Sequence, residues 1–208
     1  MLAFAALETL GQVLGLGSQQ GHYVISLVEQ LTLSGSEPVF VDDKWLPRSE
    51  NVRARHILQA SATQADGVSI HLLTRMRLKN NNHLVGSPPP FSVFMDRLLG
   101  RINSLSSLYG SGSLLSRQEK TLVLHKAEQV RLNHSQTTAD WDEWQRPDKS
   151  GREPMLFGGL RGSLSYTGDV SPCLPWLSLG QWTGIGGKTS FGLGFYQVEL
   201  HGEDDDFA

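Results

Sequence analysis

The sequence predicts an α+β protein whose C-terminal part, residues 67–202, is a ferredoxin-like βαββαβ domain, an arrangement also used by RNA-recognition sheets. Three observations predict it. Apolar residues alternate along 68–79, as in a strand. A helical apolar spacing follows three prolines at 88–90. A strand-like segment at 195–200 closes the chain after a glycine-rich loop.

The elements between these landmarks complete the βαββαβ order. The apolar stripe of the first helix consists of Phe91, Phe94, Leu98, Ile102 and Leu105. Ser116 and Glu119 form a capping box that opens a further helix to about residue 130. Residues 141–168 are typical of strand, loop and strand, and 174–179 of a short helix that Pro172 introduces.

The first 66 residues are interpreted as the remainder of another ferredoxin-like unit and a connector. Residues 2–14 are expected to be helical, residues 23–27 to form a strand after a glycine loop, and 34–66 to hold short strands. The same order, glycine loop and then strand, recurs at 184–200. We therefore expect two related units, with most of the first lying before Met1, and an acidic tail at 203–208.

Charge is distributed unevenly along the chain. The net charge is −3, which is unusual for a nucleic-acid-binding protein, but residues 203–206 contribute four of the negative charges. Between residues 71 and 131 there are nine Lys and Arg against three acidic residues. This segment predicts either a phosphate-binding surface or ordinary solvated helix faces.

The segment at 184–194 holds five glycines in eleven residues, together with Lys188, Thr189 and Ser190. Glycines allow close backbone approach to a ligand, and successive free amides form an anion site. A tight turn before an edge strand explains the same residues. A phosphate-binding P-loop is excluded because Trp182 stands where its first glycine belongs.

The glycine-rich segment, taken with its neighbours, resembles the C-terminal half of CRISPR repeat-processing endoribonucleases. These are number six of the Cas series, in the RAMP superfamily. The stretches that carry the resemblance are 157–169, 177–186 and 188–194, supported by 74–79, the helix at 91–105, the loop with Trp144, Arg146 and Arg152, and residues 6–23. The resemblance extends over nearly the whole chain.

This resemblance implies tandem ferredoxin-like domains that bind CRISPR repeat RNA. It implies metal-independent cleavage in which a 2′-hydroxyl attacks the adjacent phosphate and leaves a 2′,3′-cyclic end, with no cofactor. The RNA-binding residues it favours are Arg146, Arg152, Arg161, Gly186, Gly187, Lys188, Thr189, Ser190, Gly192 and Gly194. The family's general acid/base histidine lies early in the first unit, which this chain is expected to lack.

Among the seven histidines, His22 is the catalytic candidate, because it follows the first glycine loop; a structural strand histidine is the alternative. No histidine has metal-site spacing, so no metal is expected. Four tryptophans can stack bases, and at least two of them are expected in the core: Trp141, Trp144, Trp176 and Trp182.

The sequence is compatible with three functions. They are a repeat-processing endoribonuclease, a non-catalytic RNA-binding subunit that retains guide RNA with other Cas effector subunits, and a protein-interaction module. A single cysteine and the absence of a long apolar stretch predict a cytoplasmic protein without a membrane span. A homodimer is a further possibility.

Overall fold

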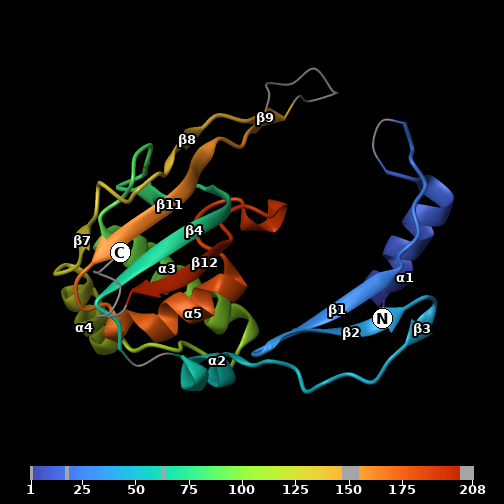
Figure 1. Ribbon diagram of the computed structural model, residues 1–208, viewed down its shortest axis with the longest axis horizontal. Helices are drawn as coiled ribbons and strands as arrows, with labels where there is room; N and C mark the ends of the chain where they lie inside the picture. Colours follow the sequence, from blue (N-terminus) through green and yellow to red (C-terminus); the bar gives the residue numbers. More distant parts are fainter. Residues whose placement is uncertain (1, 17–18, 62–63, 147–154, 202–208) are drawn as a thin grey trace. The chain divides into compact units, whose positions relative to one another are not determined.

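The computed structural model describes residues 2–16, 19–61, 64–146 and 155–201, so Arg152 and the acidic tail lie outside the described residues. The internal contacts divide the chain into two compact units, Met1–His56 and Ile57–Ala208. Figure 1 labels the elements of both units. Whether the first unit is the remainder of a ferredoxin-like domain, with a connector to residue 66, stays a prediction.

The first unit combines a short helix with a small antiparallel sheet. Its elements are α1 (Leu2–Thr9), a π-helical turn (Leu10–Leu14), β1 (Leu27–Thr32), β2 (Gly35–Val41) and β3 (Lys44–Trp45). The sheet order is β1-β2-β3. The rings of Phe4, Phe40 and Trp45 contact one another at centroid distances of 4.7 to 5.1 Å, and Phe40 is buried. This aromatic cluster is the apolar centre of the unit.

The strand predicted at 23–27 is wrong, since β1 begins only at Leu27. Tyr23 donates its amide to the Gly11 carbonyl at 3.2 Å and its hydroxyl to the Leu7 carbonyl at 2.6 Å. The segment is therefore tied to the preceding helical residues and not to a neighbouring strand. The helix α2 (Ala54–Ala60), within the region expected to hold short strands, was not predicted.

The second unit has the predicted βαββαβ order. Its main elements are β4 (Gly67–Met76), α3 (Phe91–Tyr109), α4 (Arg117–Ala127), β7 (Arg131–Leu132), β8 (Asp140–Asp142), β11 (Gly159–Thr167), α5 (Leu174–Thr183) and β12 (Tyr196–His201). Short elements are the ladders β5 (Lys79–Asn80) with β6 (His83–Leu84) and β9 (Gln145–Arg146) with β10 (Met155–Leu156), and 3₁₀ turns at Ser171–Cys173 and Thr189–Phe191.

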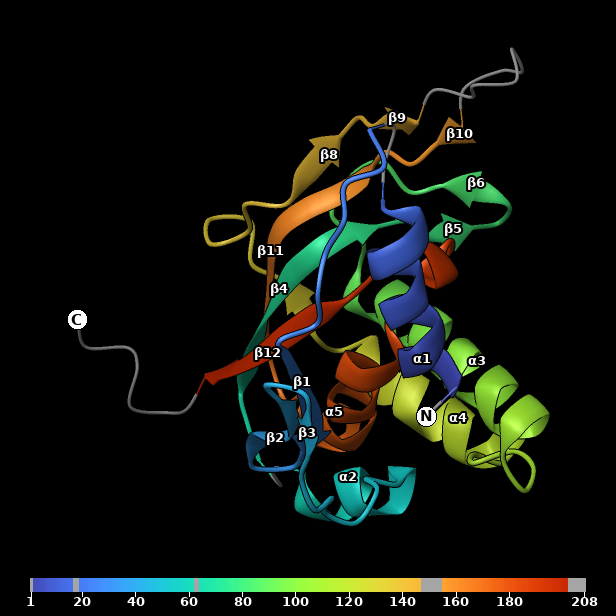
Figure 2. The same cartoon turned by 90° about the vertical axis from the view of Figure 1, so that its right-hand side faces the viewer.

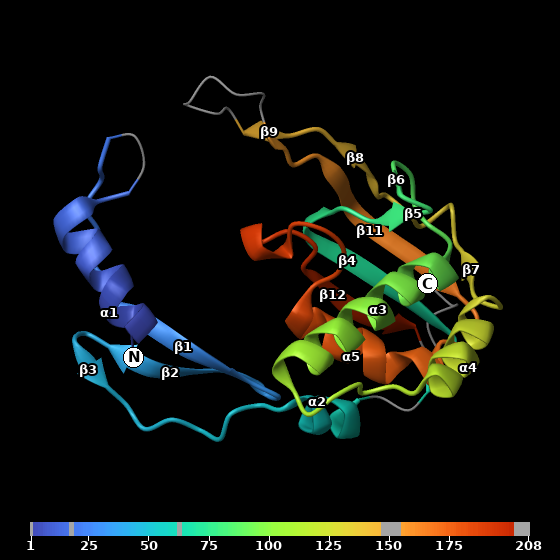
Figure 3. The ribbon, with the colours of Figure 1, turned by 180° about the vertical axis from the view of Figure 1, so that it is seen from behind.

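The sheet runs β12-β4-β11-β7, with β8 also paired to β11, and all of these pairs are antiparallel. The strand that comes first in the sequence therefore lies in the middle of the sheet, as a ferredoxin-like fold requires. Helices α3, α4 and α5 lie on one side of the sheet, as Figures 2 and 3 show. The prediction of a ferredoxin-like C-terminal domain is confirmed.

The core lies between the sheet and α3. Phe91, Phe94, Leu98 and Ile102 are buried as predicted, whereas Leu105 is only half-buried. Two buried tyrosines join helix and strand: Tyr166 donates its hydroxyl to the Pro89 carbonyl, and Tyr196 to that of Leu177. Burial raises the pKa of both phenols, so they remain protonated donors.

The tryptophan prediction is wrong. Trp141 and Trp176 are half-buried, and Trp144 and Trp182 are exposed to 41% and 37%. The core uses phenylalanine and tyrosine instead. The capping box is confirmed, because Ser116 accepts from the Glu119 amide and Glu119 accepts from the Ser116 amide.

The packing of α5 on β12 predicts a large effect at Gly180. A β-carbon there would overlap the Tyr196 hydroxyl and lie 2.6 Å from Leu98 Cδ1. We expect Gly180→Ala to lower the free energy of unfolding by about 1–3 kcal/mol, measured by urea denaturation. Gly100→Ala on α3 is the control: it meets no atom within 4 Å, so it should stabilise the protein or leave it unchanged. Equal effects of both substitutions would contradict the packing.

Candidate functional site

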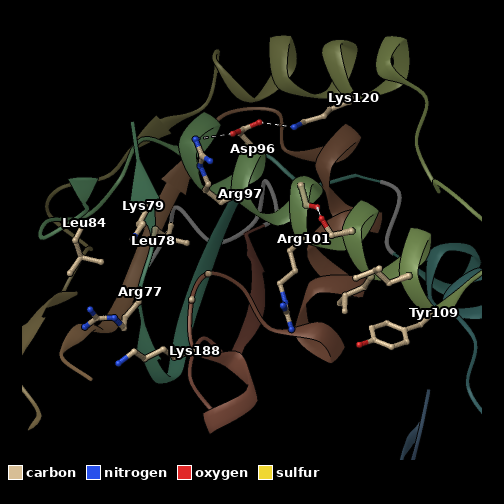
Figure 4. Close-up of a pocket in the computed structure, with 16 residues that line it drawn as sticks. Arg77, Leu78, Lys79, Leu84, Asp96, Arg97, Arg101, Tyr109, Lys120 and Lys188 are labelled. Atoms are coloured by element: carbon tan, nitrogen blue, oxygen red, sulfur yellow. Dashed lines mark hydrogen bonds and ion pairs between the residues drawn. The ribbon is translucent and has the colours of Figure 1, made fainter. Parts of the chain in front are cut away.

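A cationic groove of about 850 Å³ lies on the second unit, between α3, the end of β4 with the β5–β6 ladder, and the glycine-rich loop (Figure 4). Six basic residues line it: Arg77, Lys79, Arg97, Arg101, Lys120 and Lys188. Asp96 is the one acidic residue of the lining. Leu105, Leu108 and Tyr109 form an apolar part of the same wall. We call this site the basic groove.

Backbone carbonyls and one carboxylate hold the cations in place. Arg101 donates from Nε and Nη2 to the Thr183 carbonyl at 3.0 and 2.9 Å. Its burial lowers the pKa of the guanidinium, although an arginine remains charged at neutral pH. Asp96 pairs with Lys120 at 2.8 Å and with Arg97 at 3.3 Å (Figure 4). With so many cations sharing a single carboxylate, the groove keeps a strong positive potential.

The glycine-rich loop docks on the end of β4. The Gly187 amide donates to the Arg77 carbonyl at 2.8 Å, and the Gly194 amide donates to the Arg75 carbonyl at 3.0 Å. Gly186 and Gly194 have φ angles of 83° and 79°, and a β-carbon at either would overlap a backbone carbonyl oxygen. These glycines therefore allow the loop to approach its own chain.

The expectation of successive free glycine amides is only partly met. The amides of Gly184, Gly187, Gly192 and Gly194 all donate to backbone carbonyls within the chain. The amides of Lys188, Thr189 and Ser190, at the start of a 3₁₀ turn, have no acceptor among the described residues. Any anion bound by this loop would meet these amides, since the glycine amides, Gly186 apart, are already used.

Lys188 lies in the left-handed region, with φ 61°, and lines the basic groove. Its Nζ donates to the Leu156 carbonyl at 2.6 Å and lies 4.1 Å from the centroid of the Phe157 ring. Gly186 and Gly187 also line the groove, whereas Thr189, Ser190, Gly192 and Gly194 belong to the same loop without lining it.

The predicted arginines lie elsewhere. Arg161, on β11, is exposed and lies 3.6 Å from the Asp142 carboxylate, and it does not line the groove. Arg146 pairs with Met155 in the β9–β10 ladder, but its side chain, like the whole of Arg152, is outside the described residues. Their role in RNA binding stays a prediction.

His22 and His71 differ in how hydrogen bonds engage their ring nitrogens. In the first unit, His22 Nδ1 donates to the carbonyls of Gly11 and Gln12 at 3.2 and 3.0 Å, which leaves Nε2 free and the ring exposed. On the sheet of the second unit, His71 has both nitrogens engaged: Nε2 donates to Glu199 at 2.7 Å, and Nδ1 lies 2.8 Å from the Ser163 hydroxyl. Of these two histidines, His22 is therefore the one that presents an unoccupied nitrogen for proton transfer.

Two further observations concern metals and membranes. Within 2–16, 19–61, 64–146 and 155–201, no three His, Cys, Asp or Glu side chains gather closely enough to bind a metal ion. Over the same residues, none of the helices has the length and apolar character needed to span a bilayer.

Sequence reasoning identified the charge but not the groove. Five of its cations belong to the nine counted between residues 71 and 131, and Arg97 and Arg101 flank the helical stripe. The sequence did not predict Leu108 and Tyr109 as site residues, because the apolar stripe that predicts this helix ends at Leu105.

A model of the family described as "CRISPR-associated endoribonuclease Cas6" matches residues 70–196, which is more than half of the chain. The chain belongs to this Cas6 family. The match includes most of β4, the whole of α3 and β11, and the glycine-rich loop, and thus all the lining residues of the basic groove. The resemblance inferred from the sequence is confirmed. No curated protein matches this chain.

Solved structures show the same fold at low sequence identity. Thermus thermophilus Cas6 is similar to this Cas6 family member with a TM-score of 0.52 and 13% identity, over 71% of this chain and 58% of the Thermus chain. A structure titled as a Cas6 product complex has a TM-score of 0.52 and 12% identity, over 71% of this chain and 56% of that chain. A structure titled as a partial Cas6-RT-Cas1–Cas2 complex has a TM-score of 0.52 and 15% identity, over 81% of this chain and 29% of that chain. The chain thus spans less than two thirds of the length of the Cas6 proteins it matches.

The docking of the glycine-rich loop predicts different roles for two adjacent glycines. Gly186→Ala would place a β-carbon against the Arg77 carbonyl in a left-handed backbone, so we expect it to lower the free energy of unfolding by about 2 kcal/mol. Gly187→Ala should change stability little, because its β-carbon would lie 3.8 Å from that oxygen. Urea denaturation measures both. A stable Gly186→Ala variant would show that the loop does not need this approach.

Proposed function

We propose that this chain binds CRISPR repeat RNA and cleaves it without a metal ion or cofactor. A 2′-hydroxyl attacks the adjacent phosphate, the bond from phosphorus to the 5′-oxygen of the next nucleotide breaks, and that oxygen leaves as a hydroxyl after taking a proton from water. The observation that carries the proposal is the basic groove, with six cations and one carboxylate on the domain that the Cas6 family model matches. A phosphodiester backbone carries one negative charge per nucleotide, so a groove of this composition favours RNA over neutral ligands.

The fold itself holds two cations of the groove in fixed positions. The Thr183 carbonyl fixes Arg101, and Asp96 fixes Lys120. Side chains already held in place lose less conformational entropy when a ligand binds. Arg101 also retains Nη1, which takes no part in its hydrogen bonds to Thr183, as a donor for a phosphate oxygen.

For cleavage we propose His22 as the general base. The carbonyls of Gly11 and Gln12 hold the proton on Nδ1, and a histidine oriented in this way has its lone pair on Nε2, where it can accept the proton of a 2′-hydroxyl. The exposed ring is accessible to a large substrate.

The alternative is a non-catalytic subunit that retains guide RNA. One of the similar solved structures is titled as a partial Cas6-RT-Cas1–Cas2 complex, in which Cas6 occurs together with other Cas proteins. We propose RNA and other Cas proteins as the partners of this chain. A homodimer and a cytoplasmic location stay predictions.

The RNA-binding proposal is tested by removing three groove charges at once. We expect Lys79→Gln with Arg97→Gln and Lys188→Gln to weaken binding of CRISPR repeat RNA and to reduce the slope of log K against log salt by about 2, since each single-strand phosphate contact contributes about 0.7. Filter binding over a range of salt concentrations measures both quantities.

A matched control removes three charges from outside the groove on the same unit. It carries Arg117→Gln, Lys126→Gln and Arg131→Gln, none of which lines the groove. If the control lost as much affinity and slope as the groove variant, overall charge and not the groove would determine binding.

The cleavage proposal is tested with the same RNA in EDTA. We expect a product with a 2′,3′-cyclic end, and no product when a 2′-deoxynucleotide stands at the scissile position. His22→Ala should lower the cleavage rate by about 10²–10⁴-fold at unchanged RNA affinity. His71→Gln, whose nitrogens are already engaged, should cleave normally. Binding without any cleavage by the unmodified chain would favour the retaining subunit instead.

A further inference from the structure

The basic groove has an apolar part that the fold of the second unit does not explain. The buried stripe of α3 ends at Ile102, yet the helix continues to Tyr109. Leu108 and Tyr109 are exposed to 74% and 84%, and both line the groove. Together with half-buried Leu105 they form a contiguous apolar surface beside the cations, which suits a ligand that has both a charged and an apolar part.

The close-up view shows how three cations and the tyrosine follow one another along the groove (Figure 4). Arg77 and Lys188 lie at one end, Tyr109 lies at the other, and Arg101 lies between them. The Thr183 carbonyl fixes Arg101, so its guanidinium stands between these two cations and the ring of Tyr109. A ligand that fills the groove would therefore be anionic at one end and flat or apolar at the other.

An unpaired nucleotide has this composition. Within a duplex the bases are stacked and paired, so only the phosphates would reach a protein groove; in loops and single strands the bases turn outward and stack on aromatic side chains. An acidic peptide would satisfy the cations, but it offers no planar group for the exposed phenol ring of Tyr109.

We propose that the basic groove holds an unpaired nucleotide of the RNA, with phosphates against Arg77, Arg101 and Lys188 and the base stacked on Tyr109 between Leu105 and Leu108. This inference rests on the proposed RNA-binding function and adds to it a preference for single-stranded RNA. In this proposal Tyr109 is the residue that distinguishes single-stranded from double-stranded RNA, because it contacts a base and not the backbone.

The test measures the affinity of a short single-stranded RNA carrying one 2-aminopurine, and of the same RNA annealed to its complement. Tyr109→Ala should weaken single-strand binding by about 5- to 150-fold, the range that corresponds to one base–aromatic stack, and abolish quenching of 2-aminopurine. Tyr109→Phe keeps the ring and should bind like the unmodified chain. Duplex binding should be the same for all variants.

Leu122→Ala is the control for loss of an exposed apolar side chain, since Leu122 is 64% exposed on α4 and does not line the groove. It should leave both affinities unchanged. An RNA with an abasic site in place of 2-aminopurine should bind the unmodified chain and Tyr109→Ala equally, because the stacking partner is already absent.

The outcomes separate this inference from the proposed function. If the unmodified chain bound neither RNA, the proposed function would fail. If it bound RNA with the salt dependence of the groove while Tyr109→Ala bound single strands equally well, only the nucleotide site would be overturned. Equal weakening of single-strand and duplex binding by Tyr109→Ala would also overturn it, since that result indicates a general defect of the groove.

Discussion

The antiparallel pairing of β4 with both of its neighbours supports the rest of the second unit. Along one edge β4 pairs with β11 and along the other with β12, so its backbone hydrogen bonds are satisfied on both sides. Its inward side chains Val68, Ile70 and Met76 are fully buried. A strand fixed in this way ends at a defined position, and the residues that follow it, Arg77 and Lys79, enter the basic groove.

The glycine-rich loop depends on the same strand. Its amides at Gly187 and Gly194 donate to carbonyls at Arg77 and Arg75, and the left-handed glycines permit that close approach. The loop thus has a structural role and a place in the groove at once. A tight turn and a ligand site were alternative interpretations of these glycines, and the geometry shows that the turn is what brings Lys188 to the lining.

Electrostatics links this scaffold to the proposed ligand. Cations so close together repel one another, and their arrangement is maintained by Asp96 and by the carbonyls of Thr183, Gly158 and Leu156. Carbonyl dipoles orient an arginine or lysine without cancelling its charge. The groove therefore remains attractive to phosphates, while Tyr109 adds a surface suited to a base.

The sequence by itself determined the elements whose signals are local. The stripe of α3, the capping box at Ser116 and the alternation in β4 depend on residues a few positions apart, and the family resemblance depends on contiguous motifs. The failures also have local causes: the alternation at 23–27 resembled a strand, but hydrogen bonds from Tyr23 to Gly11 and Leu7 override it. Only the tertiary structure decided the site. The groove joins residues from 77 to 188, and the contact that positions Arg101 spans 82 positions from arginine to carbonyl. Such pairings are set by how the sheet and helices pack, and the periodicity of each element shows which of its faces is buried but not which distant residue it meets.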